Sequence, residues 1–246
     1  MSNGPGYHNR KAALATNICN LLYNLSQSTY NEIAPKIKYW IEYVLTEGFT
    51  TIDELVERIS PVAWDKRASS HYTISQFLKA FRDASHRSEQ ARSFVDGLCH
   101  HVLRWFAVAS AEDLQTDWTT GLVSKGGGYS FVRAASFVGN LIKLGLLGRE
   151  LVRRHLPKPL TAHHYSKNDK NTAKLAVRAN AIYSLLTGAG DTLLQGLLEP
   201  EDVQVCLEKM EARIPLGEIS GLYAFSAENL NVRWFLSRCP TSESNL

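Results

Sequence analysis

The sequence predicts an all-α protein built of about ten amphipathic helices. Along most of its 246 residues, apolar side chains recur at the three- and four-residue intervals that place them on one face of a helix. No segment shows the strict alternation of apolar and polar residues that a half-buried strand requires. Hydrophobic residues make up 44% of the chain and charged residues 21%, and this balance excludes a disordered, acidic or highly basic protein.

The N-terminal helices are defined by apolar stripes and by capping and stop signals. The first two stripes are Leu14, Ile18, Leu21, Leu22 and Leu25, and then Ile33, Ile37, Trp40, Ile41 and Val44. Gly48 follows where the second helix would stop. A third helix is predicted to begin at the capping box Thr51–Glu54, and Pro61 should end or kink it. A second capping box, Thr73–Gln76, should begin the fourth helix.

The later helices follow from further stripes of the same spacing. One begins after Ser88, and the next follows the glycines Gly126–Gly128, which we interpret as a link between helices. These stripes are Phe94, Val95, Leu98, Val102 and Phe106; Phe131, Ala135, Val138, Ile142 and Leu146; Leu175, Ala179, Ile182, Tyr183 and Leu186; and Val203, Leu207 and Met210.

So many short helices with polar links do not suit a single four-helix bundle. Stacked helix pairs suit them better, because each pair buries its apolar stripe against its neighbours. No repeat is identical in sequence, so the predicted fold is a HEAT-like right-handed α-solenoid of about five helical pairs. We expect a single helical-repeat domain over residues 9–238, a disordered N-terminal tail at residues 1–8 and a C-terminal tail at residues 239–246.

Cysteine usage and hydropathy predict the compartment. The four cysteines lie far apart without a C-x-x-C pair, which fits a reducing environment better than a disulfide-stapled secreted domain. The sequence has no apolar run of about 18 residues, and its first residues carry no apolar core of a secretory signal. The expected location is the cytoplasm, with the nucleus as the alternative, and no membrane is expected among the partners.

The charges are distributed unevenly along the chain, although the net charge is only +3. Residues 124–178 contain 11 basic and 2 acidic residues, and residues 179–246 contain 4 basic and 9 acidic residues. A basic stripe of this kind favours contact with the phosphates of RNA. The predicted RNA-binding residues are Arg149, Arg153, Arg154, Lys158, Lys167, Lys170, Lys174 and Arg178.

Two alternatives to RNA contact remain open for these charges. The basic stripe is equally consistent with a solvated face, or with a face paired with the acidic C-terminal third of the same protein. That acidic third could instead dock a basic protein partner.

No arrangement of residues points to catalysis, to a cofactor or to a metal. Lys125–Gly128 is glycine-rich but lacks the order of residues in a phosphate-binding loop. Cys99, His100 and His101 are adjacent, and neighbouring helical residues point about 100° apart, which does not favour chelation of one ion. We therefore expect a protein that is not an enzyme and holds no cofactor. A tryptophan left exposed would be a candidate for partner binding.

Three blocks of the sequence resemble the middle domain of the eukaryotic initiation factor 4 gamma family. They are Leu21–Ile33, Ser136–Leu147 and Ile182–Leu193, and their order and spacing agree with the family. The chain departs from the family at Arg133–Ser136, where the family has Gly-Asn-Ile-Arg, and at Asn140, where it has Glu. The motif that recognises initiation factor 4E is absent; its nearest approach, Tyr39–Leu45, is better interpreted as core packing.

The resemblance implies a HEAT-type scaffold that binds a DEAD-box RNA helicase of the translation-initiation type, and RNA. In that family the crescent of helices holds the two helicase lobes in a productive arrangement. The expected function is thus a non-catalytic RNA- and protein-binding adaptor in translation initiation or its regulation, with other translation or mRNA-processing proteins as further partners. The alternative is a protein–protein docking scaffold in mRNA metabolism without direct RNA contact.

Overall fold

The computed structural model describes residues 5–65, 68–84, 88–112, 127–155, 181, 184–185 and 188–190. Within these residues every regular element is a helix and there is no strand, which confirms the all-α prediction. The helices are α1 (Pro5–Asn24), α2 (Tyr30–Thr46), α3 (Ile52–Asp65), α4 (Ala68–Ala84), α5 (Glu89–Glu112), α6 (Gly127–Lys143) and α7 (Arg149–His155). Among the helices described, none is both long and apolar enough to cross a membrane.

Local sequence signals set several helix ends as predicted. The Thr51 hydroxyl accepts a hydrogen bond from the Glu54 amide at 3.3 Å, and the Glu54 carboxylate accepts one from the Thr51 amide at 3.2 Å. This is the reciprocal pairing of a capping box. At the end of α2, Gly48 adopts a φ of +66°, and the amide of Phe49 donates to the carbonyl of Val44 at 3.0 Å. A glycine in this left-handed conformation closes the helix with little strain.

Several predicted boundaries differ from the structure, and one of them is the glycine link, because α6 already begins at Gly127. Pro61 was expected to end or kink α3, and the helix does not end there but continues to Asp65. Proline has no amide to donate to the carbonyl of Glu57, and the Ser60 hydroxyl donates to that carbonyl instead, at 3.4 Å. The capping box predicted at Thr73–Gln76 is wrong, because α4 begins earlier, at Ala68, and Thr73 is buried inside it. At the N-terminus, α1 begins at Pro5, within the segment expected to be a tail.

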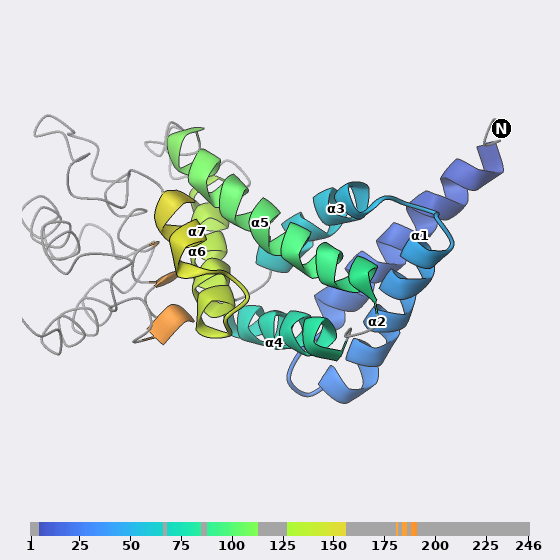
Figure 1. Cartoon of the computed structure of the whole chain (residues 1–246), viewed down its shortest axis with the longest axis horizontal. Coiled ribbons are helices and arrows are strands. Elements are labelled where there is room, and N and C mark those ends of the chain that lie inside the picture. Colours follow the sequence, from blue (N-terminus) through green and yellow to red (C-terminus); the bar gives the residue numbers. More distant parts are fainter. Residues whose placement is uncertain are drawn as a thin grey trace, which may run out of the picture.

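Helices two apart in the chain pack against each other. Helix α1 contacts α3, α3 contacts α5 and α5 contacts α7, while α2 contacts α4 and α4 contacts α6. Helix α5 is central, since it also contacts α2, α4 and α6. Figure 1 shows α1 and α2 at one end of the described helices and α6 and α7 at the other.

The core runs continuously between these helices and uses the predicted stripes between Leu14 and Leu146. The residues that make up the last two predicted stripes, from Leu175 to Leu186 and from Val203 to Met210, lie outside the described residues. Its largest fully buried side chains include Phe94 and Phe106 of α5 and Phe137 of α6. Ala181, Leu185 and Ala189 extend this core beyond α7. The segment around Leu185 lies directly on α6, because a Cβ atom added to Gly139 would meet the carbonyl oxygen of Leu185. The second and third sequence blocks thus contact each other in the fold.

Candidate nucleic-acid interface

Three of the eight predicted RNA-binding residues lie in the part of the chain that the structure describes. Arg149, Arg153 and Arg154 belong to α7, and the side chains of Arg153 and Arg154 are exposed. The other predicted residues fall outside the described residues and are Lys158, Lys167, Lys170, Lys174 and Arg178.

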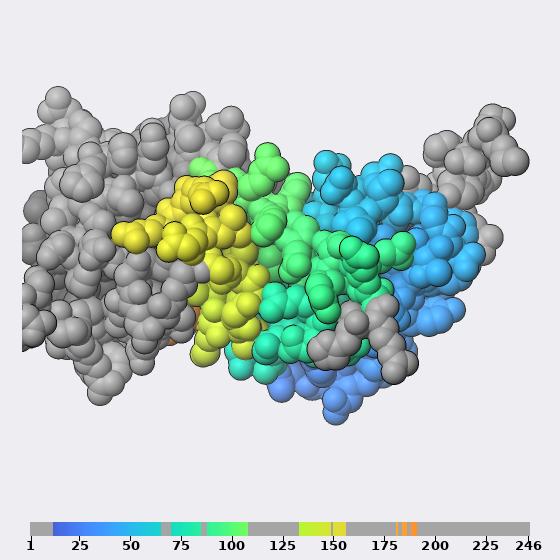
Figure 2. Space-filling model, viewed as in Figure 1, coloured from blue at the N-terminus to red at the C-terminus, as the bar shows by residue number. Residues whose placement is uncertain are grey.

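Helix α7 is held in place by its apolar side. Val152 is fully buried, and Leu151 is partly buried against the core. The amide of Val152 donates to the carbonyl of Gly148 at 3.1 Å, at the start of the helix. Because α7 packs on α5 through this side, Arg153 and Arg154 are left facing water. In Figure 2 the yellow atoms of α6 and α7 adjoin the green atoms of α5 and lie away from the blue atoms of α2.

The turn that leads into α7 is fixed by a glycine and by buried leucines. Gly145 adopts a φ of +69°, and the amide of Leu146 donates to the carbonyl of Leu141 at 2.9 Å. Leu146 and Leu147 are then buried. The left-handed glycine reverses the chain at the end of α6, so that α7 returns over the core.

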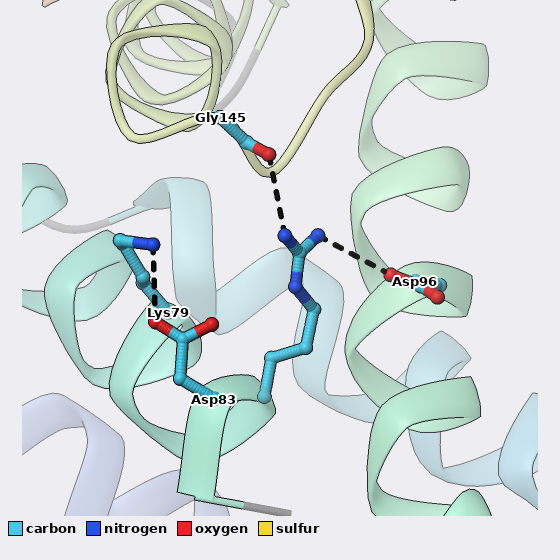
Figure 3. Close-up of polar contacts among 5 residues, drawn as sticks. Lys79, Asp83, Asp96 and Gly145 are labelled. Carbon is cyan, nitrogen blue, oxygen red and sulfur yellow. Dashed lines mark hydrogen bonds and ion pairs between the residues drawn. The ribbon is translucent and has the colours of Figure 1, made fainter. Parts of the chain in front are cut away.

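Arg82 of α4 contacts both this turn and helix α5, and Figure 3 draws its contacts with Gly145 and Asp96. Its Nη2 atom lies 3.4 Å from the carbonyl oxygen of Gly145, and its Nη1 atom lies 3.7 Å from Oδ1 of Asp96 on α5. On the same helix as Arg82, Lys79 pairs with Asp83 at 3.0 Å, whereas Asp96 pairs with Arg82. The contacts are long and partly exposed, so each contributes little stability, but together they tie α4 and α5 to the turn before α7.

The charges of α7 follow the direction of its helix dipole. Glu150 lies in the first turn, and Arg153, Arg154 and His155 lie in the last turn. Cations at a helix C-terminus are favoured by the dipole, so these arginines also have a purely structural explanation. Lys143, at the end of α6, adds an exposed cation at 5.5 Å from the centre of the Tyr72 ring. The arrangement can attract phosphate.

The sequence reasoning missed an aromatic cluster on α2. Tyr39 lies in the segment that we interpreted as core packing, yet it is 58% exposed. Its ring is stacked on that of Tyr43, with centroids 6.0 Å apart, and Trp40 contacts both rings edge to face. Val44 and Leu45 of the same segment are buried, as expected. The spacing of Tyr39 and Tyr43, four residues apart, was the available signal for a shared helix face.

Of the tryptophans, Trp40, Trp64 and Trp105 lie in the described part of the chain, and all three lie in or beside the core, as does Cys99. Trp64 is buried and stacks on Trp105 with ring centres 4.6 Å apart. Cys99 is buried, and burial raises the pKa of its thiol to about 12, with the Asp96 carboxylate adding to the effect. His100 is exposed. No group of three potential metal ligands occurs among the residues that the structure describes.

Searches with family models, among curated proteins and among solved structures find no significant match to this chain.

Proposed function

We propose that the protein is a non-catalytic adaptor that binds RNA through the basic surface around α7 and docks a DEAD-box RNA helicase. Its place would be translation initiation or the regulation of that step. The single observation that carries the RNA part is the exposed pair Arg153 and Arg154 on a helix anchored by the buried Val152. The helicase part rests on the resemblance of three sequence blocks to the initiation factor 4 gamma middle domain.

The proposed architecture of this adaptor is a HEAT-like right-handed solenoid, and the helix packing supports its stacked helix pairs. The contacts of α1 with α3, α3 with α5 and α5 with α7 give one layer, and those of α2 with α4 and α4 with α6 give the other. Stacked pairs produce this pattern, because each helix packs on its counterpart in the next pair. Helix α2 also contacts α5, and α3 also contacts α6, so the described helices pack more closely than in a strict two-layer stack.

The local excess of positive charge supports RNA rather than a neutral ligand. Residues 124–178 carry 11 basic and 2 acidic side chains, and α7 lies in the middle of this stretch. Phosphate contacts are strengthened by such clustering and weakened by salt, since bound counterions are released from the nucleic acid. Arg153 and Arg154 bring two guanidinium groups to one exposed helix end.

The RNA contact is tested by fluorescence anisotropy with a labelled single-stranded RNA over a range of salt concentrations. The variant with Arg153→Gln and Arg154→Gln should bind more weakly, and its slope of log affinity against log salt should fall by about 1.4 for two lost phosphate contacts. The matched control replaces the exposed arginines Arg58 and Arg92 with glutamine, which removes the same charge from α3 and α5. If the two variants lost equal RNA affinity, the loss would be explained by net charge alone, and a binding surface on α7 would be contradicted.

The helicase contact needs a separate assay. Addition of the protein should raise the RNA-stimulated ATPase rate of a translation-initiation DEAD-box helicase, and the two proteins should co-purify. No change in ATPase rate and no co-purification would refute this part. If no RNA binds at low salt while the helicase still does, the scaffold without RNA contact is the correct description.

A further inference from the structure

One face of α2 carries a row of two tyrosines and a carboxylate. Tyr39, Tyr43 and Glu47 follow one another at intervals of four residues, so they lie side by side along the helix. The planes of the two tyrosine rings are within 11° of parallel. Trp40 stands edge-on to both rings, and Phe49 lies 5.7 Å from Tyr43, so the row is supported from its inner side. We call Tyr39, Trp40, Tyr43, Phe49 and Glu47 the α2 ridge.

The ridge differs in exposure from an ordinary core stripe. Trp40, Tyr43 and Phe49 are partly buried and pack against the core, whereas Tyr39 is 58% exposed on the opposite side of the helix from Ile37 and Ile41. An aromatic ring that its neighbours hold in place loses little conformational freedom on binding. The supported rings therefore form a preorganised surface.

The charges around the ridge favour a cationic ligand. Lys36 pairs with Glu32 at 2.7 Å, and Lys38 pairs with Glu42 at 3.9 Å. Glu47 makes no ion pair with any residue in the described part of the chain. It also caps the C-terminal end of α2, where the helix dipole disfavours an acid and favours a cation. A positive group beside Glu47 would relieve this unfavourable arrangement.

We propose that the α2 ridge docks an arginine-bearing peptide segment of a partner protein. A guanidinium group is planar, stacks on aromatic faces and forms forked hydrogen bonds with a carboxylate. The order tyrosine, tyrosine, carboxylate presents both kinds of partner along one helix row. A lysine side chain would satisfy Glu47 but would stack poorly on the rings. The surface lies at the opposite end of the described helices from α7, so it is independent of the proposed RNA contact (Figure 1).

The test uses a fluorescein-labelled peptide of Arg-Gly-Gly repeats and the full chain, with anisotropy as the readout. The same peptide with lysine in place of arginine has the same charge and should bind at least fivefold more weakly. Tyr39→Ala should weaken binding of the arginine peptide by about fivefold to tenfold, and Tyr39→Phe should retain it because the ring face remains. Glu47→Gln should weaken binding and reduce its dependence on salt.

Two controls keep the proposal falsifiable. Tyr72→Ala removes another exposed tyrosine, on α4, and should leave peptide binding unchanged. The Arg153→Gln and Arg154→Gln variant should also leave it unchanged, so the proposal and the proposed RNA function fail independently. Equal binding of the two peptides, or full binding by Tyr39→Ala, would overturn the proposal. Loss of RNA binding or of self-association in Tyr39→Ala, without loss of peptide binding, would instead assign the ridge to RNA or to a second copy of this chain.

Discussion

Gly139 lies where α6 closely approaches the segment around residue 188. A Cβ atom at Gly139 would meet the Leu185 carbonyl oxygen, would lie 2.9 Å from the Ala189 nitrogen and would lie 3.0 Å from the Gly188 Cα. All three are backbone atoms, so no flexible side chain can move aside. Gly139→Ala therefore requires α6 and the segment at residues 184–190 to separate.

The expected loss of stability follows from two opposed contributions. Overpacking of a well-packed core costs about 1–3 kcal/mol, and the rigid backbone contacts favour the upper part of that range. Replacement of glycine by alanine inside a helix returns about 1 kcal/mol. We expect Gly139→Ala to lower the free energy of unfolding by about 2 kcal/mol, which corresponds to a fall in Tm of about 4–8 °C.

The matched control is Gly97→Ala, in the middle of α5. A Cβ atom there would lie 3.6 Å from a methyl group of Val56 and 3.7 Å from one of Ile52, which is ordinary van der Waals contact. The helix propensity should then dominate, and Tm should rise by about 2–4 °C. Thermal unfolding followed by circular dichroism at 222 nm compares the two variants with the wild-type protein.

The test is whether the Tm shifts of Gly139→Ala and Gly97→Ala have opposite signs. If Gly139→Ala is as stable as wild type, the helix crossing is looser than the structure describes. Gly188→Ala provides the reciprocal perturbation, since its Cβ would lie 2.6 Å from the carbonyl oxygen of Ser136. The double variant should lose less than the sum of the single losses, because one separation of the helices relieves both contacts.

Three further predictions concern buried or bridging side chains. Ser75→Ala should raise the free energy of unfolding by about 1 kcal/mol in urea, because the buried Ser75 hydroxyl has no hydrogen-bond partner among the described residues. Ser60→Ala should lower it, because the Ser60 hydroxyl donates to the Glu57 carbonyl. Cys99 should resist iodoacetamide at pH 8 in the native protein, as its pKa of about 12 leaves almost no thiolate; rapid labelling in peptide mass mapping would contradict its burial. Arg82→Ala should lower the free energy of unfolding by no more than about 1 kcal/mol, and it should accelerate hydrogen exchange at the Leu146 amide. Unchanged exchange at Leu146 would refute the role of Arg82 in the turn.

For the described part of the chain, the sequence alone determined the helical class, the buried stripes and several helix ends. The capping box of Thr51 and Glu54 and the stop at Gly48 depend on bonds within a few residues, so the local sequence suffices to predict them. The exposure of Arg153 and Arg154 is likewise expected for two adjacent charges beside one buried valine.

Tertiary contacts decided where α4 begins, which distant segments meet and which face of α2 is exposed. Thr73 is buried inside α4, where its local signal predicted a helix start, because burial against neighbouring helices outweighs a single cap. The contact of Gly139 with Gly188 and the hydrogen bond of Arg82 with Gly145 join residues far apart in the chain. Tyr39 is exposed because α2 turns that face away from the core, and helix rotation follows from packing, which the pattern of one helix does not contain.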